Sequence, residues 1–212
     1  QKGFSIATST RLGGADINRL LGVTVPDGLL DGSSAFDIVF QAGEGVALNI
    51  ASDLDGLAVG LPPPFNKARE QSESLDIDLR ISDALSIDAT YSNNLSLAIA
   101  QDTEDTWRAL ASIGEVRPEL TLDDVDAGTT VISGRLEELD ISAWADTQAR
   151  FRSGGNPGLP AIVWRDFSVD RLALGETDFG AFSSTGQYEG GLTSLGLAGD
   201  FIKAQIDFDG PE

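Results

Sequence analysis

The chain has 212 residues, of which 34 are acidic and 14 basic, so its formal net charge is −20. It contains no cysteine and no histidine, which excludes disulfides, thiolate zinc sites and cysteine or histidine catalysis. The negative charge disfavours nucleic acid and anionic headgroups as partners. No apolar run approaches the ~20 residues that span a bilayer, and the absence of methionine leads us to expect a piece of a longer protein.

The first part of the chain predicts strands around one helix. Residues 4–10 are predicted as a strand, and apolar residues at helical spacing predict a helix over residues 15–21. A further strand carries Phe36, Ile38 and Phe40 on one face. Glycines 43 and 45 around Glu44 then predict the turn of a hairpin.

Residues 46–100 alternate between apolar and polar side chains over several predicted strands. Successive side chains of a strand point to opposite faces, so this pattern predicts one apolar and one polar face. The polar face carries Asp76, Asp78 and Ser86. The candidate site consists of the apolar residues expected on the other face: Val46, Leu48, Ile50, Leu75, Ile77, Leu79, Ile81, Leu85, Ile87, Leu95, Leu97 and Ile99.

This apolar face needs a cover. About a dozen exposed aliphatic side chains would forgo on the order of 20–30 kcal/mol of burial free energy. The cover is expected to be a second sheet, packed helices, a partner or a lipid chain. Two features interrupt the strands: a change of apolar phase beside Gly56, which predicts a β-bulge, and the three prolines within residues 61–68, which predict an ordered loop at a sheet edge.

The second half resumes the same pattern. Residues 107–113 and 129–136 are predicted strands, and the acidic segment between them is expected to pack Leu120, Leu122 and Val125 inward. Residues 141–151 predict a second helix, residues 153–158 suit a loop or a boundary, and alternation continues from Ala161 onward. The fold class predicted is therefore mainly β: one long, twisted antiparallel sheet with two short α-helices.

An internal similarity suggests how the chain is organised. Arg11-Leu12 followed by Asp16-Ile17 recurs as Arg135-Leu136 followed by Asp140-Ile141, each time between a strand and a helix. We expect residues 1–212 to form one unit, with two repeats over about 1–127 and 128–212 as a hypothesis. Chance similarity among alternating strands is the alternative.

Catalytic and metal-binding candidates are weak. Asp123, Asp124 and Asp126 lack the glycine and glutamate positions of a calcium loop, and we interpret them as a solvated turn. The tryptophans Trp107, Trp144 and Trp164 are interpreted as core residues. We therefore expect no enzymatic activity, no metal and no cofactor.

Several motifs resemble those of one family. They are RLLG from Arg19, LDGSSAF from Leu30 and, above all, DGLAVGLPPPFNK from Asp55 to Lys67. Together with FSVDRLAL from Phe167 and the Gly134–Trp144 region, they are similar to the YhdP family, which comprises long AsmA-like proteins of the Gram-negative envelope.

This resemblance implies an inner-membrane-anchored periplasmic protein whose long curved sheet forms an apolar groove for phospholipid acyl chains. Its partners would be those acyl chains and the rest of its own chain, with the membrane anchor outside these residues and no catalytic residues. Three functions are compared: a segment of a lipid-conducting groove, a small β-barrel that binds a hydrophobic ligand, and a structural envelope domain. An open-ended groove, a capped pocket or packed apolar faces would distinguish them.

Overall fold

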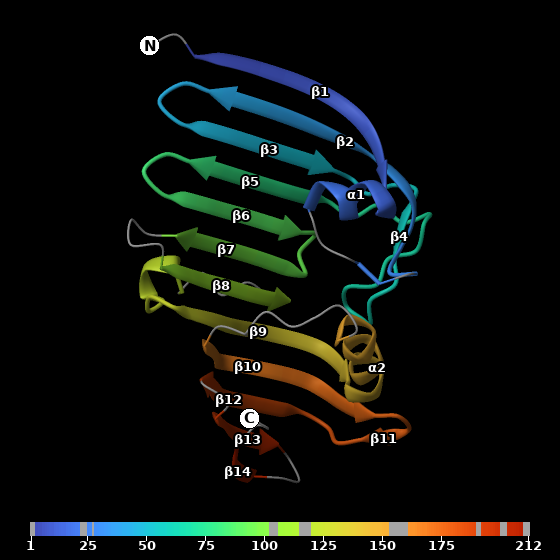
Figure 1. Ribbon diagram of the computed structural model, residues 1–212. Helices are drawn as coiled ribbons and strands as arrows, with labels where there is room; N and C mark the ends of the chain where they lie inside the picture. The colour runs from blue at the N-terminus through green and yellow to red at the C-terminus, as the bar shows by residue number, and fades with distance from the viewer. Residues whose placement is uncertain are drawn as a thin grey trace.

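The computed structural model describes residues 3–21, 25–26, 28–101, 106–114, 120–152, 161–189, 192–199 and 203–209. These residues form one sheet of 14 strands, with two α-helices and a short 3₁₀ helix (Figure 1). The strands are β1 (Phe4–Gly13), β2 (Leu30–Ala42), β3 (Val46–Ser52), β4 (Leu57–Val59), β5 (Leu75–Ile81), β6 (Leu85–Tyr91), β7 (Leu95–Gln101), β8 (Trp107–Gly114), β9 (Thr129–Asp140), β10 (Ala161–Leu174), β11 (Thr177–Asp178), β12 (Phe182–Glu189), β13 (Leu192–Gly199) and β14 (Lys203–Asp209). The helices are α1 (Gly14–Leu21), η1 (Leu122–Asp124) and α2 (Ile141–Arg152).

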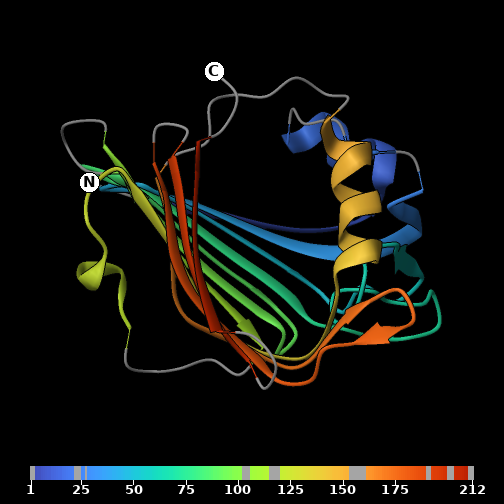
Figure 2. The same ribbon diagram turned by 90° about the horizontal axis from the view of Figure 1, so that it is seen from below.

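The strands lie side by side in chain order from β1 to β14, except that β4 pairs with β2 and β11 with β10 beside the main path. Figure 2 shows that the sheet curves into an open trough, with α1 and α2 standing along one side. Twelve strands on the path leave eleven gaps of ~4.8 Å, so the trough is about 50 Å long. The mainly β fold with two short helices is confirmed, and an open sheet does not fit the small-barrel alternative.

Two strand pairs correct the prediction of an antiparallel sheet. The pairs β8–β9 and β9–β10 are parallel, whereas every other pair among the described strands is antiparallel. Parallel neighbours require the chain to return to the same end of the sheet. The returns take place between Gly114 and Thr129 and between Asp140 and Ala161. Alternating side chains look the same in either direction, so the sequence pattern could not reveal this.

Each α-helix directly follows a strand and is capped by an aspartate. Asp16 Oδ2 accepts the Gly13 N–H at 3.2 Å before α1, and Asp140 Oδ1 accepts the Ser142 N–H at 2.8 Å at the start of α2. Helix α1 packs against β1 and β2, and α2 against β10. The strand after α1 runs antiparallel to β1, whereas the strand after α2 runs parallel to β9. The division into two repeats stays a prediction.

The chain keeps its direction along β2 from β3 to β4, and an irregular turn lies between them, where a bulge had been expected. Strand β3 ends at Ser52, and a turn follows in which Leu54 and Gly56 have φ angles of 52° and 86°. The Ser52 hydroxyl accepts the Leu54 N–H at 3.0 Å and donates to the Ala35 carbonyl at 2.7 Å. Ala51 lies opposite Asp37 and Leu57 opposite Gly32, so six steps along this chain segment match five along β2. The one extra residue that the bulge prediction requires is therefore present, within an irregular turn between β3 and β4.

The buried residues form two clusters on opposite faces of the sheet. Phe36, Leu54 and Leu57 cluster near α1. On the other face Leu110 and Val131 pack with Val125, and Leu120 and Leu122 close over them, as the sequence predicted. Within the described residues no helix is both long and apolar enough to cross a bilayer. The segment 153–158, considered above as a boundary, lies outside the described residues.

Candidate functional site

The structure places all twelve predicted residues on one face of the sheet. Residues directly opposite each other on neighbouring strands project to the same face, so the strand register defines rows that cross the sheet. One row is Ile38, Ile50, Ile77, Ala89, Leu97, Ala111, Ile132, Trp164, Gly186 and Ile206. Its neighbour contains Ile6, Phe40, Leu48, Leu79, Ile87, Ile99 and Ala109. We call this the trough face and the opposite one the outer face.

The trough face lies on the inside of the curved sheet. Ile17 of α1 lines a cavity together with Ile50 and Ile77, so the apolar side chains face the helix. Figure 2, which looks along the trough, shows the sheet as the floor and one wall, with α1 and α2 as the other wall. The predicted polar side chains Asp76 and Asp78 are on the outer face, where Arg80 forms an ion pair with Asp78.

Large apolar side chains remain exposed in this trough. Among the described residues, the exposed large hydrophobic side chains are Phe4, Ile6, Ile81, Trp107, Ile141, Leu174 and Ile206. All seven belong to the trough face or line a cavity that opens into it. Trp107 is 43% exposed, which corrects its interpretation as a core residue. Among the described residues, the large exposed apolar side chains therefore gather on one side of the sheet.

A first cavity lies under α1 and has a volume of about 330 Å³. We call it the α1 cavity. Its lining residues are Leu12, Ile17, Leu30, Phe36, Ile38, Ile50, Leu54, Leu57, Val59, Leu61, Phe65, Leu75, Ile77, Tyr91 and Leu95. Four of the twelve predicted residues are among them: Ile50, Leu75, Ile77 and Leu95. Apart from the hydroxyl of Tyr91, every lining side chain is apolar.

A second cavity, which we call the α2 cavity, has a volume of about 390 Å³ and begins at the first residue of α2. It is lined by Leu139, Ile141, Phe167, Val169, Leu172, Leu174, Phe179, Phe182, Ser184, Leu197 and Gly199. None of these residues was proposed from the sequence. Alternation was predicted from Ala161 onward, a range that includes Phe167 and Val169, but the convergence of these residues with β12 and β13 requires the fold.

The proline-containing loop between β4 and β5 closes one wall of the α1 cavity, and Lys67 anchors it. The Lys67 side chain is 2% exposed, and its Nζ donates to the Leu57 carbonyl at 2.8 Å and the Ala68 carbonyl at 3.1 Å. The Tyr91 hydroxyl donates to the Phe65 carbonyl at 3.4 Å. Burial, together with the nearby charge of Glu73, raises the pKa of Tyr91, so its hydroxyl stays protonated as a donor.

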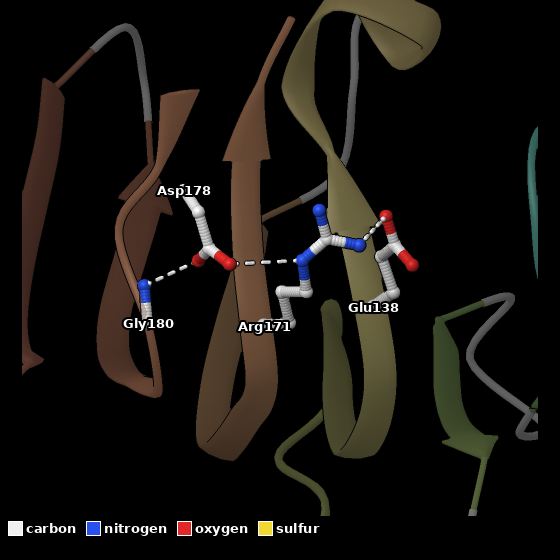
Figure 3. Close-up of polar contacts among 4 residues, drawn as sticks. All are labelled: Glu138, Arg171, Asp178 and Gly180. Carbon is white, nitrogen blue, oxygen red and sulfur yellow. Dashed lines mark hydrogen bonds and ion pairs between the residues drawn. The ribbon is translucent and has the colours of Figure 1, made fainter. Parts of the chain in front are cut away.

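An ion-pair network holds the hairpin that walls the α2 cavity (Figure 3). Arg171 donates to Glu138 at 2.9 Å and to Asp178 at 3.0 Å, while Asp178 accepts the Gly180 N–H at 2.8 Å. The Asp178 hydrogen bond and the Glu138 charge raise the pKa of Arg171, and the Gly180 N–H followed by Arg171 lowers the pKa of Asp178. The network joins β9, β10 and β11 and so places Phe179 at the cavity.

The acidic turn has structural partners. The Thr121 N–H and hydroxyl both donate to Asp124 Oδ2 at 2.8 Å, and Asp123 lies 3.9 Å from Arg108. The Thr121 backbone N–H, then its hydroxyl, lowers the pKa of Asp124. In the part of the chain that the structure describes, no group of three acidic side chains is arranged to hold a metal ion.

The remaining predicted residues lie either on the floor of the trough or at its edge beside the hairpin turns. We call this edge, around Phe4 and Ile81, the rim. Val46 and Ile81 line a further cavity of about 580 Å³ beside the hairpin turns, near Phe4. Leu48, Leu79, Leu85, Ile87, Leu97 and Ile99 form the floor on β3 to β7, the strands that also carry the floor of the α1 cavity. The structure thus adds to the site α1, the proline-containing loop and most of the second half of the sheet.

The chain is similar to a known protein family. The model of a family described as YhdP protein matches residues 20–212. No curated protein and no solved structure matches the chain.

Proposed function

The chain belongs to the YhdP family of AsmA-like envelope proteins, and from that premise we propose that its trough is a segment of a route for phospholipid acyl chains between the inner and outer membranes. The route would lie in the periplasm, held by an inner-membrane anchor outside these residues, and would support outer-membrane integrity. The chain would act by binding, without a catalytic step, cofactor or metal.

One observation carries this proposal: apolar rows cross the whole sheet, and large apolar side chains at one rim stay open to solvent. Phe4 and Ile6 are 57% and 56% exposed on the same face as the α1 cavity. Burying such a side chain contributes roughly 1.5–3 kcal/mol, so this surface gains free energy when an apolar ligand covers it. Alkyl chains require no hydrogen-bond partner, and a trough lined by apolar side chains suits them.

A structural envelope domain is the second candidate. It predicts apolar faces packed against each other, and the buried cluster around Phe36 and Leu57 has that character. The exposed apolar residues of the trough are not packed against another face of the described residues, and they favour the lipid route.

Site-specific photo-crosslinking in cells tests the proposal. A photoreactive residue at Ile77 or Leu79 should capture phospholipid, whereas one at Asp76 or Asp78, the neighbours on the outer face, should not. The variant Leu79→Asp should block capture along the trough, because an unpaired carboxylate in an apolar channel costs several kcal/mol. The matched variant Asp78→Asn should leave it unchanged. Equal labelling of both faces, or none, would favour the structural domain.

A further inference from the structure

The two cavities are separate although both belong to the trough face. They share no lining residue. The floor position Leu95 belongs to the α1 cavity and Phe167 to the α2 cavity, with Ile113 and Gly134 between them in the same row. Three strand gaps of ~4.8 Å place these two floor positions about 14 Å apart. Both volumes, about 330 and 390 Å³, are at the lower end of the range for ligand pockets.

The base of α2 divides the cavities. Phe65, in the wall of the α1 cavity, meets Trp144 of α2 edge to face, with ring centroids 5.8 Å apart. Ile141, one turn earlier on α2, lines the other cavity. Helix α2 packs against β10, which contributes Phe167 and Val169 to that cavity. The first turns of α2 therefore contact both cavity walls.

Burial of the floor agrees with this division. Leu136 of β9 is paired with Val169 on the trough face, and it is only 4% exposed. Ile81, on the same face but far from α2, is 46% exposed. The trough floor is thus open near the hairpin turns and buried at Leu136, which lines a cavity together with Pro63 and Pro64 of the proline-containing loop.

We propose that the trough binds alkyl chains at two separate sites, the α1 cavity and the α2 cavity, with the Phe65–Trp144 contact as the divider. The ligand class is an alkyl chain, because the side chains of the linings offer only the hydroxyls of Tyr91 and Ser184 for polar contact. The Tyr91 hydroxyl is already engaged with the Phe65 carbonyl. The inference rests on the proposed function, since both require alkyl chains in the trough, but it adds that they bind at discrete positions.

Cavity-filling variants with matched controls test the two-site arrangement. Ser184→Trp fills the α2 cavity, and Ser183→Trp places the same side chain on the outer face of the same strand. Leu75→Trp fills the α1 cavity, with Asp76→Trp as its outer-face control. The probe is hexadecanol carrying a diazirine, an uncharged single chain that the net charge of −20 does not repel. Native mass spectrometry counts bound probe, and peptide mapping after irradiation locates it.

The expected result is two probes per chain at saturation, with crosslinks in two sets of peptides. Each filling variant should lose one probe and the corresponding set, and the two outer-face variants should lose neither. Trp144→Ala removes the divider, so crosslinks should also appear at Ile113, which lies between the two sets of peptides. Loss of both sets by one filling variant, or a continuous set in the parent chain, would overturn the two-site inference and leave the proposed function standing. No binding at either site would overturn both.

Discussion

The protein covers one apolar surface and leaves another open, on opposite faces of the same strands. On the outer face of β8 and β9, Leu110 and Val131 are 7% and 0% exposed beneath the segment that carries Val125. On the trough face of β8, Trp107 is 43% exposed. The backbone is shared, so the difference lies only in what packs above each face.

This difference shows how little chain is needed to cover an apolar patch. Three apolar residues on the segment around η1, Leu120, Leu122 and Val125, suffice for the outer cluster. The trough has two helices and a proline-containing loop along one wall, yet its opposite rim stays uncovered around Phe4 and Ile81. The outer cluster is therefore a stability element, whereas the rim around Phe4 and Ile81 remains open to solvent.

Placing a charge on each surface should give the largest difference in stability between the covered cluster and the open rim. Val131→Asp buries an unpaired carboxylate and should lower the free energy of unfolding by several kcal/mol, enough to unfold most of the protein. Ile81→Asp, on a half-exposed rim position, should change it by less than about 1 kcal/mol. Urea denaturation followed by circular dichroism measures both.

The conservative change Val131→Ala keeps the first experiment informative if the aspartate variant does not fold. It should still destabilise the protein more than Ile81→Ala does, because it leaves a cavity in a closed cluster. Similar losses at both positions would mean that the rim is covered in solution.

Removing the Lys67 side-chain contacts should show how much this lysine contributes to holding the loop that walls the α1 cavity. Lys67→Met keeps the apolar stem but leaves the Leu57 and Ala68 carbonyls without their donor, at a cost of about 1–3 kcal/mol. Lys203→Met, at an exposed position, is the matched control. We expect a lower urea midpoint and weaker probe binding in the α1 cavity for the first variant only. Unchanged binding would show that the loop keeps its place without this lysine.

Alternation of side chains predicted the strands and their faces, because a period of two depends on local geometry alone. It placed all twelve candidate residues on one face without knowing strand order. It could not predict that β9 runs parallel to both its neighbours, since direction depends on where the chain returns.

The α2 cavity escaped prediction for a related reason. Its walls come from the end of β9, the first turn of α2 and strands β10 to β13, which meet only in the folded sheet. Lys67 was visible as part of a motif, but a lysine satisfied by two carbonyls carries no sequence signal that distinguishes it from a surface lysine. Trp107 was assigned to the core because aromatic residues usually lie there, and its strand register places it at the open rim.

Trp107 should report whether the open rim takes part in binding. It lines neither the α1 cavity nor the α2 cavity, so alkyl chains confined to these two sites should leave its indole in water. A fluorescence shift to shorter wavelength on probe binding should therefore persist in Trp107→Phe and decrease in Trp144→Phe, because Trp144 lies at the divider. A shift that disappears in Trp107→Phe would place a bound chain on the rim, outside both sites.

The smallest expected effect concerns the segment that covers the outer cluster. The Thr121 N–H and hydroxyl bind the Asp124 carboxylate and lower its pKa in the folded state. A carboxyl group with a depressed folded-state pKa stabilises the fold fully above its unfolded pKa of ~3.9, and this contribution is lost as the pH falls through the folded-state value. Asp124→Asn should therefore lower the urea midpoint slightly at pH 7 and progressively less below about pH 4. Because Asp124 is exposed to solvent, the difference should be small and should shrink further in salt. A midpoint difference that stayed constant across this pH range would show that the charge of Asp124 does not hold the cover, and that the packing of Leu120, Leu122 and Val125 is sufficient to keep the outer face closed.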